Sequence, residues 1–147
     1  MVRATLSVIL FFTAVASGAT PREELVALRA KLAKGRDLRR TSGNQAELAF
    51  AARLKDANLA AEIMYDVGLS EKGEDDSTVS PALVKLLKTH PDVQPWAGMA
   101  RYWLGMAYSR RSSTRPQSVE MLESCRTVDA VPAMMRADAL YRLGEVH

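Results

Sequence analysis

The segment ARYWLGMAY, residues 100–108, decides the fold of this chain. It has the composition of a helix, yet it places Tyr102 and Trp103 beside Leu104-Gly105. Glycine inside a helix costs about 1 kcal/mol relative to alanine, and it is favoured where the backbone of another helix must come close. A large residue one turn away then fills the space beside that contact. A packing motif of this kind should recur elsewhere in the chain.

The motif does recur. Three segments carry tyrosine two residues before an aliphatic residue that is followed by glycine, namely IMYDVG at 63–68, ARYWLG at 100–105 and ALYRLG at 139–144. Their glycines are 37 and then 39 residues apart. This spacing predicts that the three glycines mark equivalent close crossings in successive helical hairpins, which bury a continuous core only when they stack.

The segments between the copies share the same period. Pro95 and Pro132, each expected to open a helix, are 37 residues apart. The intervening helices match at a spacing of 36, where Ala82, Leu83 and Leu86 correspond to Ser118, Val119 and Leu122. Several markers with one period therefore predict a repeat rather than a single chance match.

Turn and cap signals divide the rest of the chain. Ser80-Pro81 supplies the cap and the first residue of a helix, and Pro116 opens another. TSGN, residues 41–44, is expected to be a break, and residues 70–79 form a polar loop. Alternating β-branched runs are scarce outside the N-terminus. We therefore predict an all-α fold of about six or seven helices.

At this point the chain resembles the tetratricopeptide repeat family. Leu104-Gly105 followed three residues later by Tyr108 is similar to the Leu-Gly-x-x-Tyr signature of that family, and its periplasmic members resemble this chain most. Ala82 and Ser118 stand where its second helix has a small residue. The resemblance covers residues 45–147, but the period exceeds the family's usual length of about 34. It implies stacked antiparallel helix pairs, an α-solenoid, over residues 44–147.

The resemblance also implies a concave groove lined by the first helix of each pair. The residue two before the family's leucine points into that groove, and here it is Tyr65, Tyr102 and Tyr141. Met106 and Arg110 follow Tyr102 along the same helix. Such residues suit an extended or helical peptide. The alternative is that the tyrosines only pack between helices.

Residues 1–19 predict a secretory signal peptide. Arg3 precedes an apolar run at 4–16, and small residues at 16–19 allow cleavage after Ala16, Gly18 or Ala19. The run is shorter than the about 20 residues of a bilayer span, so an uncleaved anchor is only the alternative. We therefore expect an exported protein, periplasmic or secreted, with no stable membrane span after cleavage. Residues 20–43 predict a basic amphipathic helix and linker, acting as a cap or in self-association.

The sequence carries no recognisable catalytic chemistry. His90, His147 and Cys125 do not have metal-ligand spacing, and no phosphate-binding loop or nucleophile elbow is found. The net charge of +3 is too small to indicate nucleic acid. We therefore predict a protein that is not an enzyme, with no cofactor or metal, binding a peptide or protein partner. Cys125 is expected to be a small buried hydrophobe.

A second resemblance concerns the segment RDLR. Arg36, Leu38 and Arg39 are similar to the Arg-x-Leu-Arg motif of secreted oomycete effectors, whose helical domains carry Trp and Tyr motifs. The acidic Glu-Glu-Arg sequence that follows in those proteins is missing, because TSGNQAE comes after Arg40. The alternative function is therefore an effector of a plant pathogen that acts inside host cells. A third possibility is a secreted helical bundle without a binding role.

Overall fold

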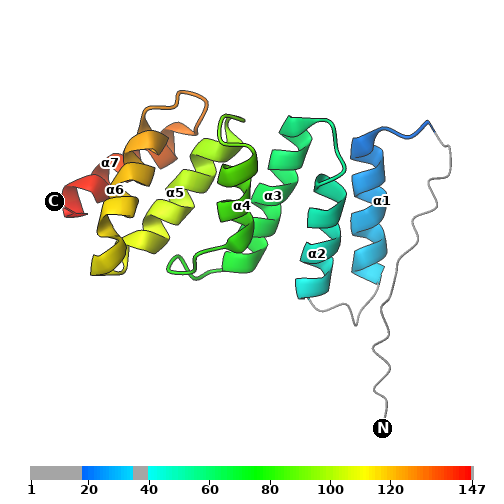
Figure 1. Ribbon diagram of the computed structural model, residues 1–147, viewed down its shortest axis with the longest axis horizontal. Helices are drawn as coiled ribbons and strands as arrows, with labels where there is room; N and C mark the ends of the chain where they lie inside the picture. The colour runs from blue at the N-terminus through cyan, green and yellow to red at the C-terminus, as the bar shows by residue number, and fades with distance from the viewer. Residues whose placement is uncertain (1–17, 35–39, 147) are drawn as a thin grey trace, which may run out of the picture.

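The computed structural model describes residues 18–34 and 40–146, and this part of the chain is all-helical. The α-helices follow one another along the long axis of the molecule (Figure 1). They are α1 (Pro21–Lys34), α2 (Arg40–Ala51), α3 (Ala57–Lys72), α4 (Pro81–Thr89), α5 (Trp96–Ser109), α6 (Arg115–Arg126) and α7 (Ala133–Val146), with a 3-10 turn at Ser112–Thr114. The prediction of an all-α fold is confirmed.

The helix starts follow from local capping chemistry. The Ser80 hydroxyl oxygen accepts a hydrogen bond from the Leu83 amide at 3.2 Å, and Pro81 is the first residue of α4. The Asp56 carboxylate accepts from the amides of Asn58 and Leu59 at 2.9 and 3.1 Å, which begins α3. The predicted start at Ser80-Pro81 is therefore confirmed.

The break predicted at TSGN is wrong. Helix α2 begins at Arg40 and runs through residues 41–44, so residues 40–43, the end of the expected linker, are helical. Gly43 costs about 1 kcal/mol in such a position. The packing of Leu48, Phe50 and Ala51 on the core offsets that cost.

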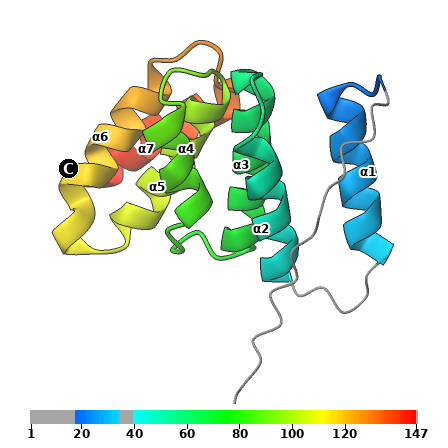
Figure 2. The ribbon, with the colours of Figure 1, turned by 45° about the vertical axis from the view of Figure 1, so that its right-hand side comes forward.

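Consecutive helices contact each other, and α5 also contacts both α3 and α7. In Figure 2 the view is turned so that α1 stands at one end of the row while α6 and α7 lie at the other. The largest fully buried aliphatic side chains come from α3, α4, α5 and α6, and they are Ile63, Leu83, Leu86, Leu104 and Leu122. The core thus continues from one helix pair to the next. No helix in the described residues combines the length and the apolar character that crossing a membrane requires.

Two of the three repeated glycines lie in equivalent surroundings. A Cβ atom added to Gly68 would lie 2.5 Å from Leu83 Cγ, and one added to Gly105 would lie 2.8 Å from Leu122 Cγ. Each glycine therefore lets the following helix place a leucine against its backbone. A Cβ on Gly144 would meet nothing within 4 Å among the described residues, so the close crossing predicted at this third glycine is not found there.

The register of the intervening helices differs from the prediction. The contacts with glycine make Leu83 equivalent to Leu122, which is a spacing of 39 residues instead of the predicted 36. The difference arises because more residues separate the start of α6 from Leu122 than separate the start of α4 from Leu83. Ser118, one turn before Leu122, is fully buried, and its hydroxyl donates to the Gly105 carbonyl oxygen at 2.8 Å.

Candidate functional site

The five residues predicted to bind a partner divide into a buried and an exposed group. Tyr65, Tyr102 and Met106 are buried, with 6%, 8% and 4% of their surface exposed. Arg110 is exposed at the end of α5, and Tyr141 on α7 is 63% exposed. The structure brings Tyr65 and Tyr102 into one aromatic cluster, whereas Tyr141 lies apart from it. Their role in binding stays a prediction.

Tyr65 connects α3 to α5. Its hydroxyl oxygen accepts a hydrogen bond from the Trp103 indole N–H at 3.0 Å, and its ring lies 5.7 Å from the Trp96 ring. The Trp96 indole in turn donates to the Asn58 side-chain oxygen at 2.9 Å. Burial raises the pKa of Tyr65, although the bond from Trp103 opposes that effect.

Tyr102 connects α5 to α7 in the same manner. Its hydroxyl donates to Asp138 Oδ2 at 2.7 Å, and its ring meets the Trp103 ring edge-on at 4.9 Å. Burial and the bond to Asp138 both raise the pKa of Tyr102. Arg142 Nε lies 3.6 Å from the same carboxylate. Tyr65 and Tyr102 thus pack between helices. This was the alternative to partner binding that the sequence left open for them.

Lys72 is a member of this cluster that the sequence did not reveal. Its side chain is 8% exposed, and Nζ lies 4.2 Å from the centre of the Trp103 ring. The same ammonium group pairs with Asp76 at 2.6 Å and donates to the Gly73 carbonyl oxygen at 3.1 Å. Residues 70–79 were expected to be a loop, so a cation over an indole could not be inferred there. The one local signal is the spacing of four residues between Lys72 and Asp76.

The two indoles remain half-buried, so part of each is open to a ligand. Trp96 and Trp103 both contact the buried Tyr65, and Lys72, paired with Asp76, lies over the ring of Trp103. Arg110 follows Tyr102 by two helical turns and Met106 by one, so it lies on the same side of α5. This side therefore offers aromatic surface and charged groups, which suits a peptide chain.

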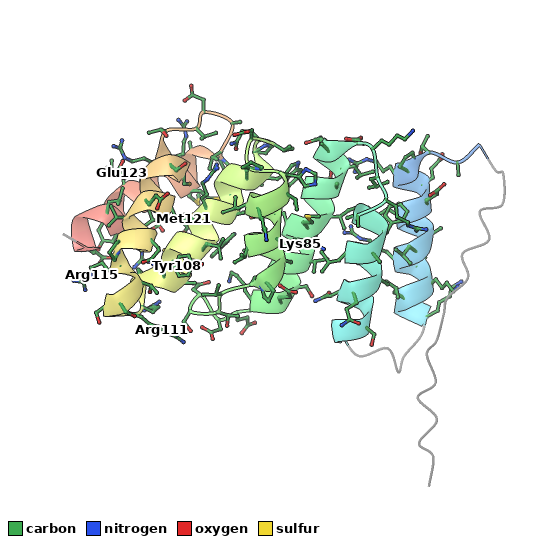
Figure 3. All side chains as sticks on the ribbon, in the orientation of Figure 1. Lys85, Tyr108, Arg111, Arg115, Met121 and Glu123 are labelled. Atoms are coloured by element: carbon green, nitrogen blue, oxygen red, sulfur yellow. The ribbon has the colours of Figure 1, made fainter. Side chains whose placement is uncertain are left out.

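A second surface surrounds Tyr108, the tyrosine of the family signature. Figure 3 shows Tyr108 and Met121 where α5 meets α6, with Arg111 and Arg115 at the lower end of α6. Tyr108 is half-buried and both arginines are exposed, as is Lys85 on α4. Tyr108, Arg111 and Arg115 are close together in the sequence, whereas Met121 and Lys85 come from other parts of the chain, so the sequence did not indicate this surface as a whole.

A cavity of about 340 Å³ lies among α1, α2 and α3. Arg29 projects into it, and its guanidinium pairs with Glu47 at 2.8 Å and with Asp66 at 2.9 Å. The remaining lining residues are Asn44, Val67, Leu69 and Ser70. Both carboxylates pair with the one arginine, so its guanidinium is not free to bind an anionic ligand, and these three side chains carry one more negative than positive charge.

The other candidates for chemistry give no site in the described part of the chain. Cys125 is a buried free thiol, and burial raises its pKa to about 11, which confirms its prediction as a small hydrophobe. Across residues 18–34 and 40–146, no three His, Cys, Asp or Glu side chains are placed to hold a metal ion. Arg36, Leu38 and Arg39 of the targeting motif lie outside the described residues, as do residues 1–17 of the predicted signal peptide.

Comparison of the chain with protein-family models, with curated proteins and with solved structures gives no significant match.

Proposed function

We propose that the chain is an exported scaffold without enzymatic activity, built from tetratricopeptide-like repeats, which binds a peptide or protein partner on the side of α5 that carries the indoles. One observation carries the proposal, namely the repetition of contacts from one helix pair to the next. Leucine meets glycine in both α3–α4 and α5–α6. The hydroxyls of Tyr65 and Tyr102 each bond to the next odd-numbered helix. Repeats of this kind present extended binding surfaces.

In this proposal the buried residues position the exposed ones. Tyr65 accepts the N–H of Trp103, and Tyr102 packs against the same ring, so the indole is held in one orientation. Fixing an aromatic side chain before binding reduces the entropy that the complex loses. Trp96, Trp103 and Arg110 then contact the partner directly. Met106 is 4% exposed, so in this proposal it acts by packing in the core and not by direct contact with the partner.

The export part of the proposal rests on residues 1–19, which combine Arg3, the apolar run and the small residues of a signal peptide. The absence of catalytic motifs in the sequence supports the proposal that the scaffold has no enzymatic activity. The groove of the tetratricopeptide family supplies the expected ligand, an extended or helical peptide segment.

The test uses a matched pair of charge reversals. Arg110→Glu changes the proposed surface, whereas Lys88→Glu changes an exposed position on α4. The tagged chain is produced in its own cells, cross-linked in the exported fraction, and its partners are quantified by mass spectrometry. We expect Arg110→Glu and Trp103→Ala to lose the same partner, which Lys88→Glu retains. Equal capture by all three variants would remove the surface from consideration, and circular dichroism checks that each is folded.

A further inference from the structure

The outward face of α7 is apolar from Ala133 to Gly144. The exposed residues on this face include Met134, Leu140 and Tyr141, which are 84%, 59% and 63% exposed. The small residues Ala133, Ala137 and Gly144 are exposed between them. Charged side chains lie only at the edges of this face, where Arg136 pairs with Asp129 and Arg142 with Glu145. An exposed helix normally presents polar residues on its outer face, so a face of this composition indicates contact with another surface.

The corresponding face is covered in both preceding copies of the motif. Leu83 lies against Gly68, and Leu122 lies against Gly105. Gly144 is the third glycine of the series, and no described side chain approaches it. The two covered copies define what an occupant of the α7 face must supply, which is a helix with a large apolar residue opposite the glycine.

We propose that this occupant is α7 of a second copy of the chain, docked antiparallel about a two-fold axis. Met134, Ala137, Tyr141 and Gly144 are spaced by three, four and three residues, which is the seam of a coiled coil. In the antiparallel register centred on residue 139, Met134 faces Gly144 of the second copy, and Tyr141 faces Ala137 of the second copy. Each large residue thus meets a small one, and the symmetry makes every pair occur twice.

The flanks of the helix are compatible with this register. Leu140 lies on one flank near the two-fold axis and meets Leu140 of the second copy. Asp138 lies on the other flank, where its carboxylate is compensated within its own chain by the Tyr102 hydroxyl at 2.7 Å and by Arg142 at 3.6 Å. The approach of two such helices therefore brings together no uncompensated like charges.

The contact is small, because each copy contributes one helix of 14 residues. Interfaces below about 1,200 Å² generally belong to weak or transient complexes. We therefore expect a dimer that dissociates on dilution through the micromolar range. The Gly144 substitutions used to test it do not touch the indole surface, so the dimer and the scaffold proposal can fail separately.

Sedimentation velocity of the chain without residues 1–19, the predicted signal peptide, over a range of concentrations provides the first test. The unmodified chain should shift from monomer to dimer as concentration rises. Gly144→Leu should remain monomeric because the new side chain occupies the place of Met134 of the second copy. Its melting temperature should not fall, since a Cβ at Gly144 meets nothing within 4 Å among the described residues of its own chain. In the double variant Met134→Gly, Gly144→Met a large side chain again faces a glycine of the second copy, so the dimer should be restored.

Cysteine pairing tests the register. An equal mixture of Met134→Cys and Gly144→Cys chains should form a mixed disulfide under mild oxidation, while each variant alone should form little. Native Cys125 is fully buried and does not compete. A monomer at every concentration overturns the proposal, even if another protein binds this face. A dimer that survives Gly144→Leu, or efficient pairing of Met134→Cys with itself, overturns it as well.

Discussion

Leu122 of α6 lies directly against the backbone of Gly105 in α5, 2.8 Å from the position that a Cβ atom would take. Leu83 of α4 makes the same contact with Gly68 of α3. In both pairs the leucine is almost completely buried, so it cannot move toward solvent to admit a methyl group. The two glycines are therefore fixed by packing against the next helix and not by any need for an unusual backbone conformation.

Overpacking in Gly105→Ala should lower the free energy of unfolding by about 1–3 kcal/mol. The higher helix propensity of alanine should offset about 1 kcal/mol of that loss. Besides Leu122, the added methyl group would meet Met121 Cβ at 3.3 Å. Gly105→Leu should cost more than Gly105→Ala because it displaces more of the core. Urea denaturation followed by circular dichroism measures both.

Gly144→Ala is the matched control. It places the same methyl group in the third copy of the motif, where no atom of the described part of the chain lies within 4 Å. The helix gain then acts alone, and we expect the free energy of unfolding to rise by up to about 1 kcal/mol. If the two alanine variants changed stability equally and in the same direction, close helix contact at Gly105 would not explain the repeat.

Tyr102→Phe should destabilise the protein by about 1–2 kcal/mol, because it removes a 2.7 Å hydrogen bond to a carboxylate between α5 and α7. Tyr141→Phe removes a hydroxyl that is exposed and should change the free energy of unfolding by less than about 0.5 kcal/mol. Thermal unfolding of the two variants at a protein concentration where the chain is monomeric makes the comparison. Equal stability of both variants would show that the bond to Asp138 contributes nothing net.

Local signals predicted the helix boundaries well. Ser80-Pro81 encodes both a capping hydroxyl and a first helical residue, so the start of α4 needs no information from the rest of the fold. The glycine period also predicted the close contacts at Gly68 and Gly105. TSGN misled because its polar, flexible residues favour a break locally, while the core packing of α2 outweighs that preference.

The candidate site was harder to predict, because its contacts join residues far apart in the sequence. Tyr65 meets Trp103, which is 38 residues away, and Tyr102 meets Asp138, which is 36 away. A tyrosine at the expected spacing has the same sequence signature whether it faces a ligand or the next helix. Which of the two holds depends on the partner that the following repeat presents, and the periodicity does not contain that information.

Cys125 should react with a thiol reagent only when the chain unfolds. The residue is fully buried, and burial raises the pKa of its thiol to about 11, so the reactive thiolate is scarce in the native state at neutral pH. Labelling with a chromogenic disulfide should be slow in buffer and fast in denaturant. Since the chain has one cysteine, the native rate directly reports opening around α6. Rapid labelling of the native protein would contradict the burial of this residue.

The stability of the protein should fall as the pH rises above about 10, the ordinary pKa of tyrosine. The pKa of Tyr102 is raised in the folded state by burial and by Asp138, so above this pH the unfolded chain releases a proton that the folded chain retains. Stability from this source is complete below pH about 10 and decreases by about 1.4 kcal/mol for each further pH unit until the folded-state pKa is reached. Tyr102→Phe should make the fall less steep, leaving the contributions of Tyr65 and Cys125, whose pKa values are also raised, and urea denaturation of both chains between pH 9 and about 11 compares them. Parallel curves for the two chains would show that Tyr102 ionises as readily in the folded protein as in the unfolded one.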